Sequence, residues 1–128
     1  MIASADNQPL LSIVVPAYNE EATLSAIVTR LLAVPEAGEI VIVDDCSSDG
    51  TREIADRLAA EHPRIKVAHH PVNRGKTEAL KTGFALTTGQ IVIVQDADLE
   101  YDPAEIGDVI APHTNWIYAS KLPPDFPL

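Results

Sequence analysis

The sequence has 128 residues, a hydrophobic content of 46% and a formal net charge of −10 at pH 7. This length fits one domain with a buried core, and the acidic balance argues against binding to nucleic acid or anionic lipid. The single cysteine, Cys46, excludes an internal disulfide, which suits a reducing cytosol. Residues 1–10 carry no signal-peptide pattern and are expected to be flexible, and no apolar stretch reaches the roughly 20 residues that span a bilayer. We therefore expect a cytoplasmic protein that docks, at most, on the cytoplasmic face of a membrane.

Three short apolar runs are typical of strands buried on both faces, because the side chains of both orientations are apolar. They are Leu11–Val15, Ile40–Val43 and Ile91–Val94. Ile65–His69 alternates between apolar and polar residues, which predicts a weaker strand near an edge of the sheet.

Three helices are predicted between these strands. Asn19 is expected to cap the first, whose apolar residues recur on one face, and the second has a shorter apolar stripe before Pro63. The third covers Lys76–Leu86, and a short fourth helix, capped by Asp102, follows the last strand. The apolar faces consist of Leu24, Ile27, Val28, Leu31 and Leu32 in the first helix, and of Ile54, Ala55, Leu58 and Ala59 in the second.

The β-α-β-α-β-α-β-α order predicts an α/β fold, a mostly parallel sheet with helices on both faces and right-handed crossovers. We expect one domain over residues 11–110. Beyond Ile110 the pattern changes, because four of the ten prolines lie between 112 and 127. Residues 111–128 are therefore expected to be an atypical proline-rich tail, which a truncation of the chain would explain.

Polar clusters follow the three apolar strands. They lie at residues 16–20, 44–49 and 96–100. The carboxyl ends of parallel strands meet at one edge of the sheet, where ligands bind in such folds. Asp96 and Asp98 are two residues apart, so in extended chain both carboxylates point the same way and can share one Mg²⁺ or Mn²⁺. Glu100 is a candidate third ligand. The alternative, a solvated acidic turn, is disfavoured by the buried strand that precedes the pair.

Asp44 and Asp45 are expected to point to opposite sides of the chain if their strand continues that far. One interpretation gives one of them a ligand role, in which it accepts hydrogen bonds from a base or a ribose. The other interpretation is structural, with the carboxylate bracing the turn at 47–50. The sequence pattern leaves both open.

The basic residue Lys76 lies at a helix start, where it suits an anionic ligand as well as simple solvation. Residues 73–77 do not form a phosphate-binding P-loop, because His70 stands where that motif requires glycine. His69 and His70 should point to opposite faces of their strand, so they are poor joint metal ligands and are interpreted as structural. Cys46 lacks an activating partner nearby in the sequence, which argues against a nucleophilic role.

Four sequence runs resemble family 2 glycosyltransferases with the GT-A fold, and in particular the polyprenol-phosphate (dolichol-phosphate) mannosyl- and glucosyltransferases. The runs are LSIVVPAYNEE, EIVIVDDCSSDGT, NRGKTEALKTGF and GQIVIVQDADLEYDP. The resemblance implies the Rossmann-like nucleotide-binding half of that fold. It also implies a metal-dependent, inverting transfer of sugar from a GDP- or UDP-sugar, with a polyprenyl phosphate at the membrane surface as the acceptor.

The resemblance implies roles for single residues as well. Asp98 would be the catalytic residue, and with Asp96 and Glu100 it would hold Mg²⁺ or Mn²⁺ at the donor diphosphate. Lys76 joins the donor-binding set because of its place at the helix start. The complete donor-binding set is Pro16, Ala17, Tyr18, Glu20, Val43, Asp45, Lys76, Asp96, Ala97 and Asp98.

One departure from the family leaves the activity open. Relatives continue with a strand and acceptor-side residues that include an arginine, where this sequence offers Lys121 beside a proline-rich end. The alternative function is a truncated, catalytically incomplete nucleotide-binding remnant or module. A receiver domain fits the Asp96/Asp98 pair poorly, and a dinucleotide oxidoreductase is disfavoured because no GxGxxG motif follows the first strand. The pattern assigns no oligomeric state.

Overall fold

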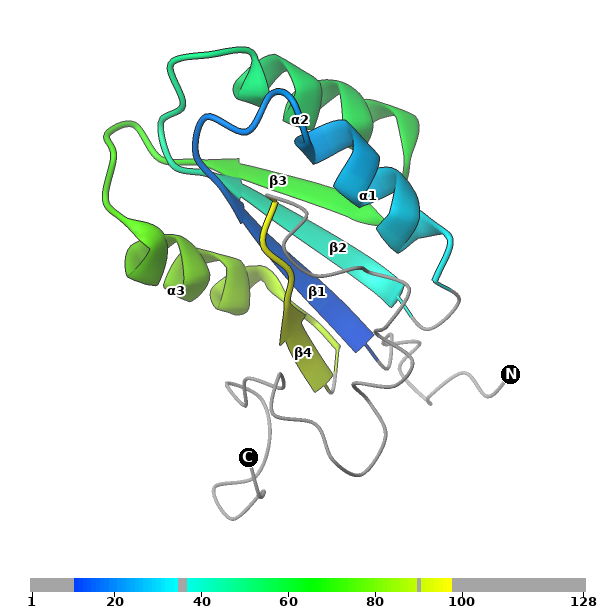
Figure 1. Ribbon diagram of the computed structural model, residues 1–128. Coiled ribbons are helices and arrows are strands. Elements are labelled where there is room, and N and C mark those ends of the chain that lie inside the picture. Colours follow the sequence, from blue (N-terminus) through cyan, green and yellow to red (C-terminus); the bar gives the residue numbers. More distant parts are fainter. Residues whose placement is uncertain (1–10, 35–36, 90, 98–128) are drawn as a thin grey trace.

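The computed structural model describes residues 11–34, 37–89 and 91–97, which form a four-stranded parallel sheet with helices on both faces (Figure 1). The strand order is β3-β2-β1-β4. In chain order the elements are β1 (Leu11–Ala17), α1 (Leu24–Leu32), β2 (Ala37–Asp44), α2 (Thr51–Glu61), β3 (Ile65–His69), α3 (Lys76–Leu86) and β4 (Ile91–Val94). The predicted α/β fold is confirmed, and so is the place of β3 at an edge of the described sheet.

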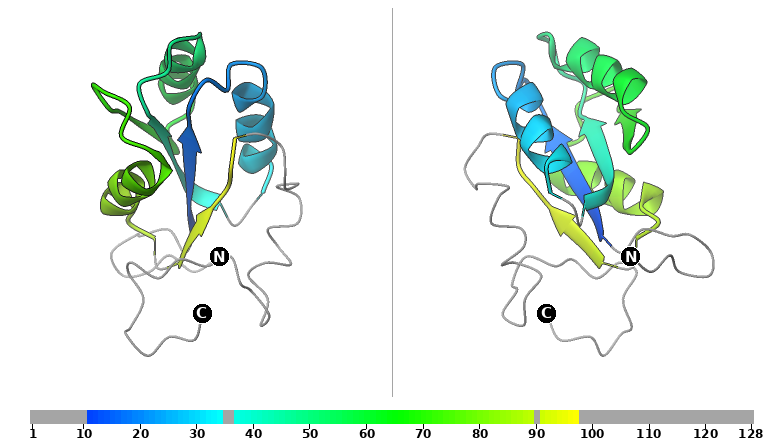
Figure 2. Two further views of the ribbon diagram at one scale, coloured as in Figure 1. Left: turned by 60° about the vertical axis from the view of Figure 1, so that its left-hand side comes forward. Right: turned by 90° about the vertical axis from the view of Figure 1, so that its right-hand side faces the viewer.

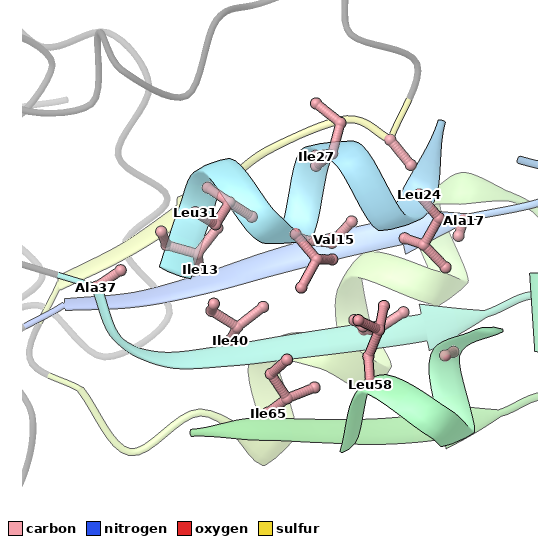
Figure 3. Close-up of a cluster of buried hydrophobic side chains, with 14 of the residues drawn as sticks. Ile13, Val15, Ala17, Leu24, Ile27, Leu31, Ala37, Ile40, Leu58 and Ile65 are labelled. Atoms are coloured by element: carbon pink, nitrogen blue, oxygen red, sulfur yellow. The ribbon is translucent and has the colours of Figure 1, made fainter. Parts of the chain in front are cut away.

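Helices α1 and α2 cover one face of the sheet, and α3 covers the other (Figures 1 and 2). Because successive side chains of a strand point to opposite faces, each face has its own apolar layer. The layer under α1 and α2 is the larger one (Figure 3), and its members include Ile13, Val15, Ile40, Ile42, Leu24, Ile27, Leu31 and Leu58. The layer under α3 consists of Val14, Val41, Val43, Ala79 and Val92. Burial of both faces explains why β1, β2 and β4 are apolar at most positions, whereas the edge strand β3 alternates.

Helix α3 packs closely onto the sheet at Gly83. A Cβ atom at this position would clash with the Val14 side chain and would lie 3.3 Å from Val43 Cγ2. The absence of a side chain therefore lets α3 approach β1 and β2. This approach positions the N-terminus of α3, which follows β3 and lies at the carboxyl edge of the sheet.

Strand β1 runs two residues beyond its predicted end, and Pro16 lies inside it. β1 pairs with β2 as far as Ala17, whereas its pairing with β4 ends at Val14. The last rung toward β4 is the Gln95 N–H donating to the Val14 carbonyl at 2.9 Å. The next rung would need an N–H from residue 16, which proline lacks. Pro16 therefore stands where β1 and β4 part.

The prediction that Asn19 caps α1 is wrong. α1 begins at Leu24, its N-cap position is Thr23, and no side chain caps it. Asn19 instead has a φ of 54°, and its Oδ1 accepts a hydrogen bond from the Ser48 N–H at 2.8 Å. A distant partner therefore takes the side-chain oxygen that a cap would have used.

Two further predictions, the short helix capped by Asp102 and the proline-rich tail at 111–128, lie outside the described residues. In the part of the chain that the structure describes, none of the helices combines the length and the apolar character needed to cross a bilayer.

Candidate functional site

A cavity of about 480 Å³ lies at the carboxyl edge of the sheet, beside the point where β1 and β4 part. This is the switch point of the sheet, because β2 and β3 lie on one side of β1 and β4 lies on the other. Folds of this type bind their ligands at such a point. The lining residues are Pro16, Ala17, Tyr18, Glu20, Asp45, Asn73, Gly75, Lys76, Ala79, Asp96 and Ala97.

The loop after β1 is held against the loop after β2 by hydrogen bonds. The Asn19 N–H donates to Ser47 Oγ at 2.9 Å, and the Glu20 N–H donates to Thr51 Oγ1 at 2.8 Å. These bonds fix the backbone on which Tyr18 and Glu20 line the cavity. Tyr18 keeps 49% of its surface exposed, so a large aromatic face is available to a ligand.

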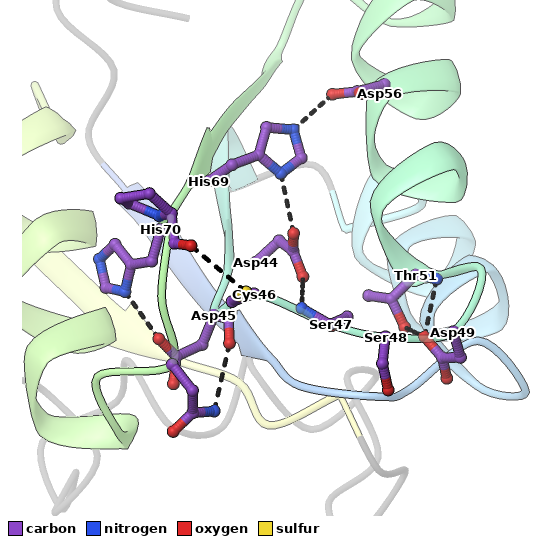
Figure 4. A network of polar contacts seen from close by, with 12 residues as sticks. Asp44, Asp45, Cys46, Ser47, Ser48, Asp49, Thr51, Asp56, His69 and His70 are labelled. Atoms are coloured by element: carbon purple, nitrogen blue, oxygen red, sulfur yellow. Dashed lines mark hydrogen bonds and ion pairs between the residues drawn. The ribbon is translucent and has the colours of Figure 1, made fainter.

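Asp44 is buried and braces the turn after β2 (Figure 4). Its Oδ1 accepts a hydrogen bond from the Ser47 N–H at 3.1 Å, and its Oδ2 lies 2.9 Å from His69 Nδ1. His69 Nε2 lies 2.7 Å from Oδ1 of Asp56, which belongs to α2. Burial alone would lower the pKa of His69, but the hydrogen bonds to Asp44 and Asp56 outweigh it and raise the pKa above its usual 6.5.

Asp45 lines the cavity and organises the loop before α3 (Figure 4). Its Oδ1 accepts a hydrogen bond from the Arg74 N–H at 2.9 Å and lies 2.7 Å from His70 Nδ1, while its Oδ2 accepts from the Gly75 N–H at 2.8 Å. Asn73 Nδ2 donates to the main-chain carbonyl of Asp45 at 3.2 Å. Burial alone would raise the pKa of Asp45, but these hydrogen bonds to its carboxylate outweigh it and lower the pKa below its usual 3.8. The carboxylate is therefore ionised at neutral pH.

The start of α3 brings a cation to the cavity. Gly75 has a φ of 93°, a conformation that glycine adopts without strain, and it leads the chain into α3. Nζ of Lys76 lies 2.5 Å from Asp96 Oδ1, and the two side chains are 58% and 22% exposed. Thr23 Oγ1 donates to the Ala97 carbonyl, which ties the chain after β4 to the start of α1. A lysine at a helix N-terminus suits an anionic group, so the arrangement can receive a phosphate.

The structure brings most of the predicted site residues together. Those that line the cavity are Pro16, Ala17, Tyr18, Glu20, Asp45, Lys76, Asp96 and Ala97. Val43 does not line it, because its side chain is fully buried in the layer under α3. Asp98 and Glu100 lie outside the described residues, and within those that are described no group of three His, Cys, Asp or Glu side chains could hold a metal.

Three lining residues were not predicted from the sequence. They are Asn73, Gly75 and Ala79. The signal that could have found Asn73 and Gly75 is topological, since the loop between a parallel strand and the next helix reaches the carboxyl edge of the sheet. Ala79 lies one turn into the helix that follows this loop.

Residues 12–116 match the family described as Glycosyl transferase family 2. The chain belongs to this family. One relative that aligns with this chain is the undecaprenyl-phosphate 4-deoxy-4-formamido-L-arabinose transferase of Shewanella sediminis. It is 38% identical over an alignment of 111 residues, and the alignment covers 82% of this chain and 33% of that protein.

The solved structures that resemble this family 2 chain include the following two. The mannosyltransferase PcManGT from Pyrobaculum calidifontis, in complex with GDP-Man and Mn²⁺, has a TM-score of 0.65 and 32% identity, over 71% of this chain and 28% of its own. Glucosyl-3-phosphoglycerate synthase from Mycobacterium tuberculosis, in complex with UDP, has a TM-score of 0.65 and 32% identity, over 81% of this chain and 39% of its own. The predicted GT-A relationship is thereby confirmed. The chain spans about a third of the length of these relatives.

Proposed function

We propose that this chain is the donor-binding part of a metal-dependent, inverting glycosyltransferase. Its substrates would be a GDP- or UDP-sugar and a polyprenyl phosphate. The observation that carries the proposal is the cavity at the switch point of a family 2 sheet, where a buried carboxylate and a lysine–aspartate pair line one space. Its volume of about 480 Å³ lies in the range of small-molecule sites.

The donor would lie with its base near Asp45 and its diphosphate near the start of α3. Pro16, Ala17, Tyr18 and Glu20 would line the nucleotide, and Val43 would contribute through the backbone beside Asp45. Lys76 and the first N–H groups of α3 would receive the diphosphate, because a helix N-terminus and an ammonium group both attract phosphate.

Mg²⁺ or Mn²⁺ would be held by Asp96 together with Asp98 and Glu100. The described part of the site fits such an ion, because the Asp96 carboxylate is at the cavity and already attracts the charge of Lys76. Carboxylate oxygens are the ligands that both ions prefer. When bound, the ion would stabilise the negative charge of the departing diphosphate, and Asp98 would owe its catalytic role to holding it. The Mn²⁺ named with the Pyrobaculum mannosyltransferase supports this assignment.

The acceptor class is supported by the name of the Shewanella relative, an undecaprenyl-phosphate transferase. A phosphate acceptor is already an anion, so the transfer needs no strong general base. Such an acceptor would bring the protein to the cytoplasmic face of a membrane. The second candidate function is a nucleotide-binding module without turnover, which would use the same cavity. A radiolabelled-sugar transfer assay with short polyprenyl phosphates separates the two.

Calorimetric titration of UDP and GDP, with Mn²⁺ and then with chelator, tests nucleotide binding. Binding is expected only with the metal, since a chain of net charge −10 repels a bare diphosphate. Asp96→Asn is expected to weaken metal-dependent binding at least about tenfold. Asp56→Asn, which removes an exposed carboxylate outside the cavity, is the matched control. Equal affinity with and without metal, or a loss in the control that matches the loss in Asp96→Asn, would refute the metal-bridged site.

A further inference from the structure

His70 lies immediately behind the cavity wall and touches the carboxylate that lines it. The residue is 5% exposed and is not itself part of the lining. Its Nδ1 lies 2.7 Å from Asp45 Oδ1, and its Nε2 lies 2.8 Å from Thr82 Oγ1 on α3. The ionised Asp45 carboxylate can only accept, so His70 Nδ1 must donate. The Thr82 hydroxyl can donate or accept, so the contact with Asp45 persists whether or not Nε2 carries a proton.

The contacts of Asp45 determine how many further donors it can accept. A carboxylate oxygen offers two acceptor positions. Oδ1 uses both, for His70 Nδ1 and the Arg74 N–H, and Oδ2 uses one, for the Gly75 N–H. Among the contacts of the described residues, one acceptor position therefore remains, on Oδ2. Asp45 is only 4% exposed, so water cannot readily satisfy a ligand donor that finds no partner there.

The bases of the two candidate donors differ in how many N–H groups they present to a carboxylate. The Watson–Crick edge of uracil has one, the ring N3–H, between two carbonyl groups. The same edge of guanine has two side by side, the ring N1–H and the exocyclic amino group, which together match both oxygens of a carboxylate. An Asp45 with one acceptor position suits the uracil edge, because guanine would leave a buried donor unpaired.

We infer that His70 is a positioning residue that sets the base preference of the cavity in favour of uracil, by occupying the Asp45 oxygen that a guanine edge would need. This inference rests on the proposed function, since it requires a nucleotide to bind in the cavity. The neighbouring His69 makes the same kind of contact with Asp44, but neither of these two residues lines the cavity. His69 therefore offers a control with the same chemistry and no route to the base.

The test is calorimetric titration of the full chain with UDP and with GDP, in the presence of Mn²⁺. The wild type is expected to bind UDP about tenfold more tightly than GDP, which corresponds to about 1.4 kcal/mol. His70→Ala frees one acceptor position on Oδ1. The preference for UDP over GDP should then fall from about tenfold to between about onefold and threefold, because one unpaired donor of guanine regains its partner. His70→Asn should keep the ratio, because its amide N–H can take the place of Nδ1. His69→Asn should keep it as well.

A merely structural role for His70 would weaken both nucleotides alike and leave the ratio unchanged, so an unchanged ratio in a folded His70→Ala variant overturns the inference. GDP binding at least as tight as UDP binding in the wild type also overturns it, while the proposed nucleotide site stands. If neither nucleotide binds, both fail. UDP methylated at N3 gives a test that needs no variant. Its affinity for the wild type should fall at least about tenfold, and equal affinity for the methylated and unmethylated nucleotides would again overturn the inference.

Discussion

Replacing Gly83 with alanine tests how closely α3 must approach the sheet. Glycine to alanine in a helix interior stabilises by about 1 kcal/mol, because alanine costs less backbone entropy on folding. Against this, the new Cβ would clash with the side chain of Val14, which is fully buried in the central strand β1, and would press on Val43. Overpacking of a closed core costs about 1–3 kcal/mol, and this overlap belongs at the upper end because β1 is held between two strands. We expect a net loss of about 1–2 kcal/mol in the free energy of unfolding.

Urea denaturation followed by circular dichroism measures this loss. Ala85→Gly calibrates the helix-propensity term, because Ala85 is an exposed position of the same helix. Val14→Ala, combined with Gly83→Ala, removes the group that would clash. The double variant is therefore expected to be more stable than the sum of the two single losses, by at least about 0.5 kcal/mol. A Gly83→Ala variant as stable as the wild type, or strict additivity in the double variant, would show that α3 does not pack as tightly as described.

Two further predictions concern charged contacts. Lys76→Met is expected to weaken UDP binding about tenfold or more, because a charge-assisted contact with phosphate is lost. The free energy of unfolding should change by less than about 1 kcal/mol, because the ion pair between Lys76 and Asp96 is partly exposed. Calorimetric titration and urea denaturation of the same sample measure both quantities. A loss of stability without a loss of UDP affinity would contradict the prediction. His69 has a pKa raised by Asp44 and Asp56, so its contribution to stability is fully present below its unfolded pKa of about 6.5 and is lost as the pH rises through the folded value. His69→Asn should therefore destabilise more at about pH 5.5 than at about pH 9, and an equal loss at both pH values would exclude the ionic contacts.

The sequence predicted the place of the cavity but not all of the residues that line it. The polar clusters after three strands were expected to meet. The cavity is lined by residues of the clusters that follow β1 and β4, and by Asp45 of the cluster that follows β2. The pattern left open which of Asp44 and Asp45 faces it. Hydrogen bonds from the Arg74 and Gly75 amides decide the question for Asp45, and these donors lie 29 and 30 residues further along the chain. A local pattern carries no information about donors that only folding brings near.

The sequence by itself determined the type and order of the described elements, because that information is local, although β1 and β2 are longer than their apolar runs. The apolar runs predicted β4 at Ile91–Val94 and the cores of β1 and β2, and helical spacing predicted α3 at Lys76–Leu86. Only the tertiary structure decided how side chains with several competing partners are used. Asn19 was expected to cap a helix, but the Ser48 N–H of a distant loop takes its oxygen. A polar side chain near many backbone groups has several possible hydrogen-bond partners of similar energy. The packing of separate loops determines which of these partners is within reach.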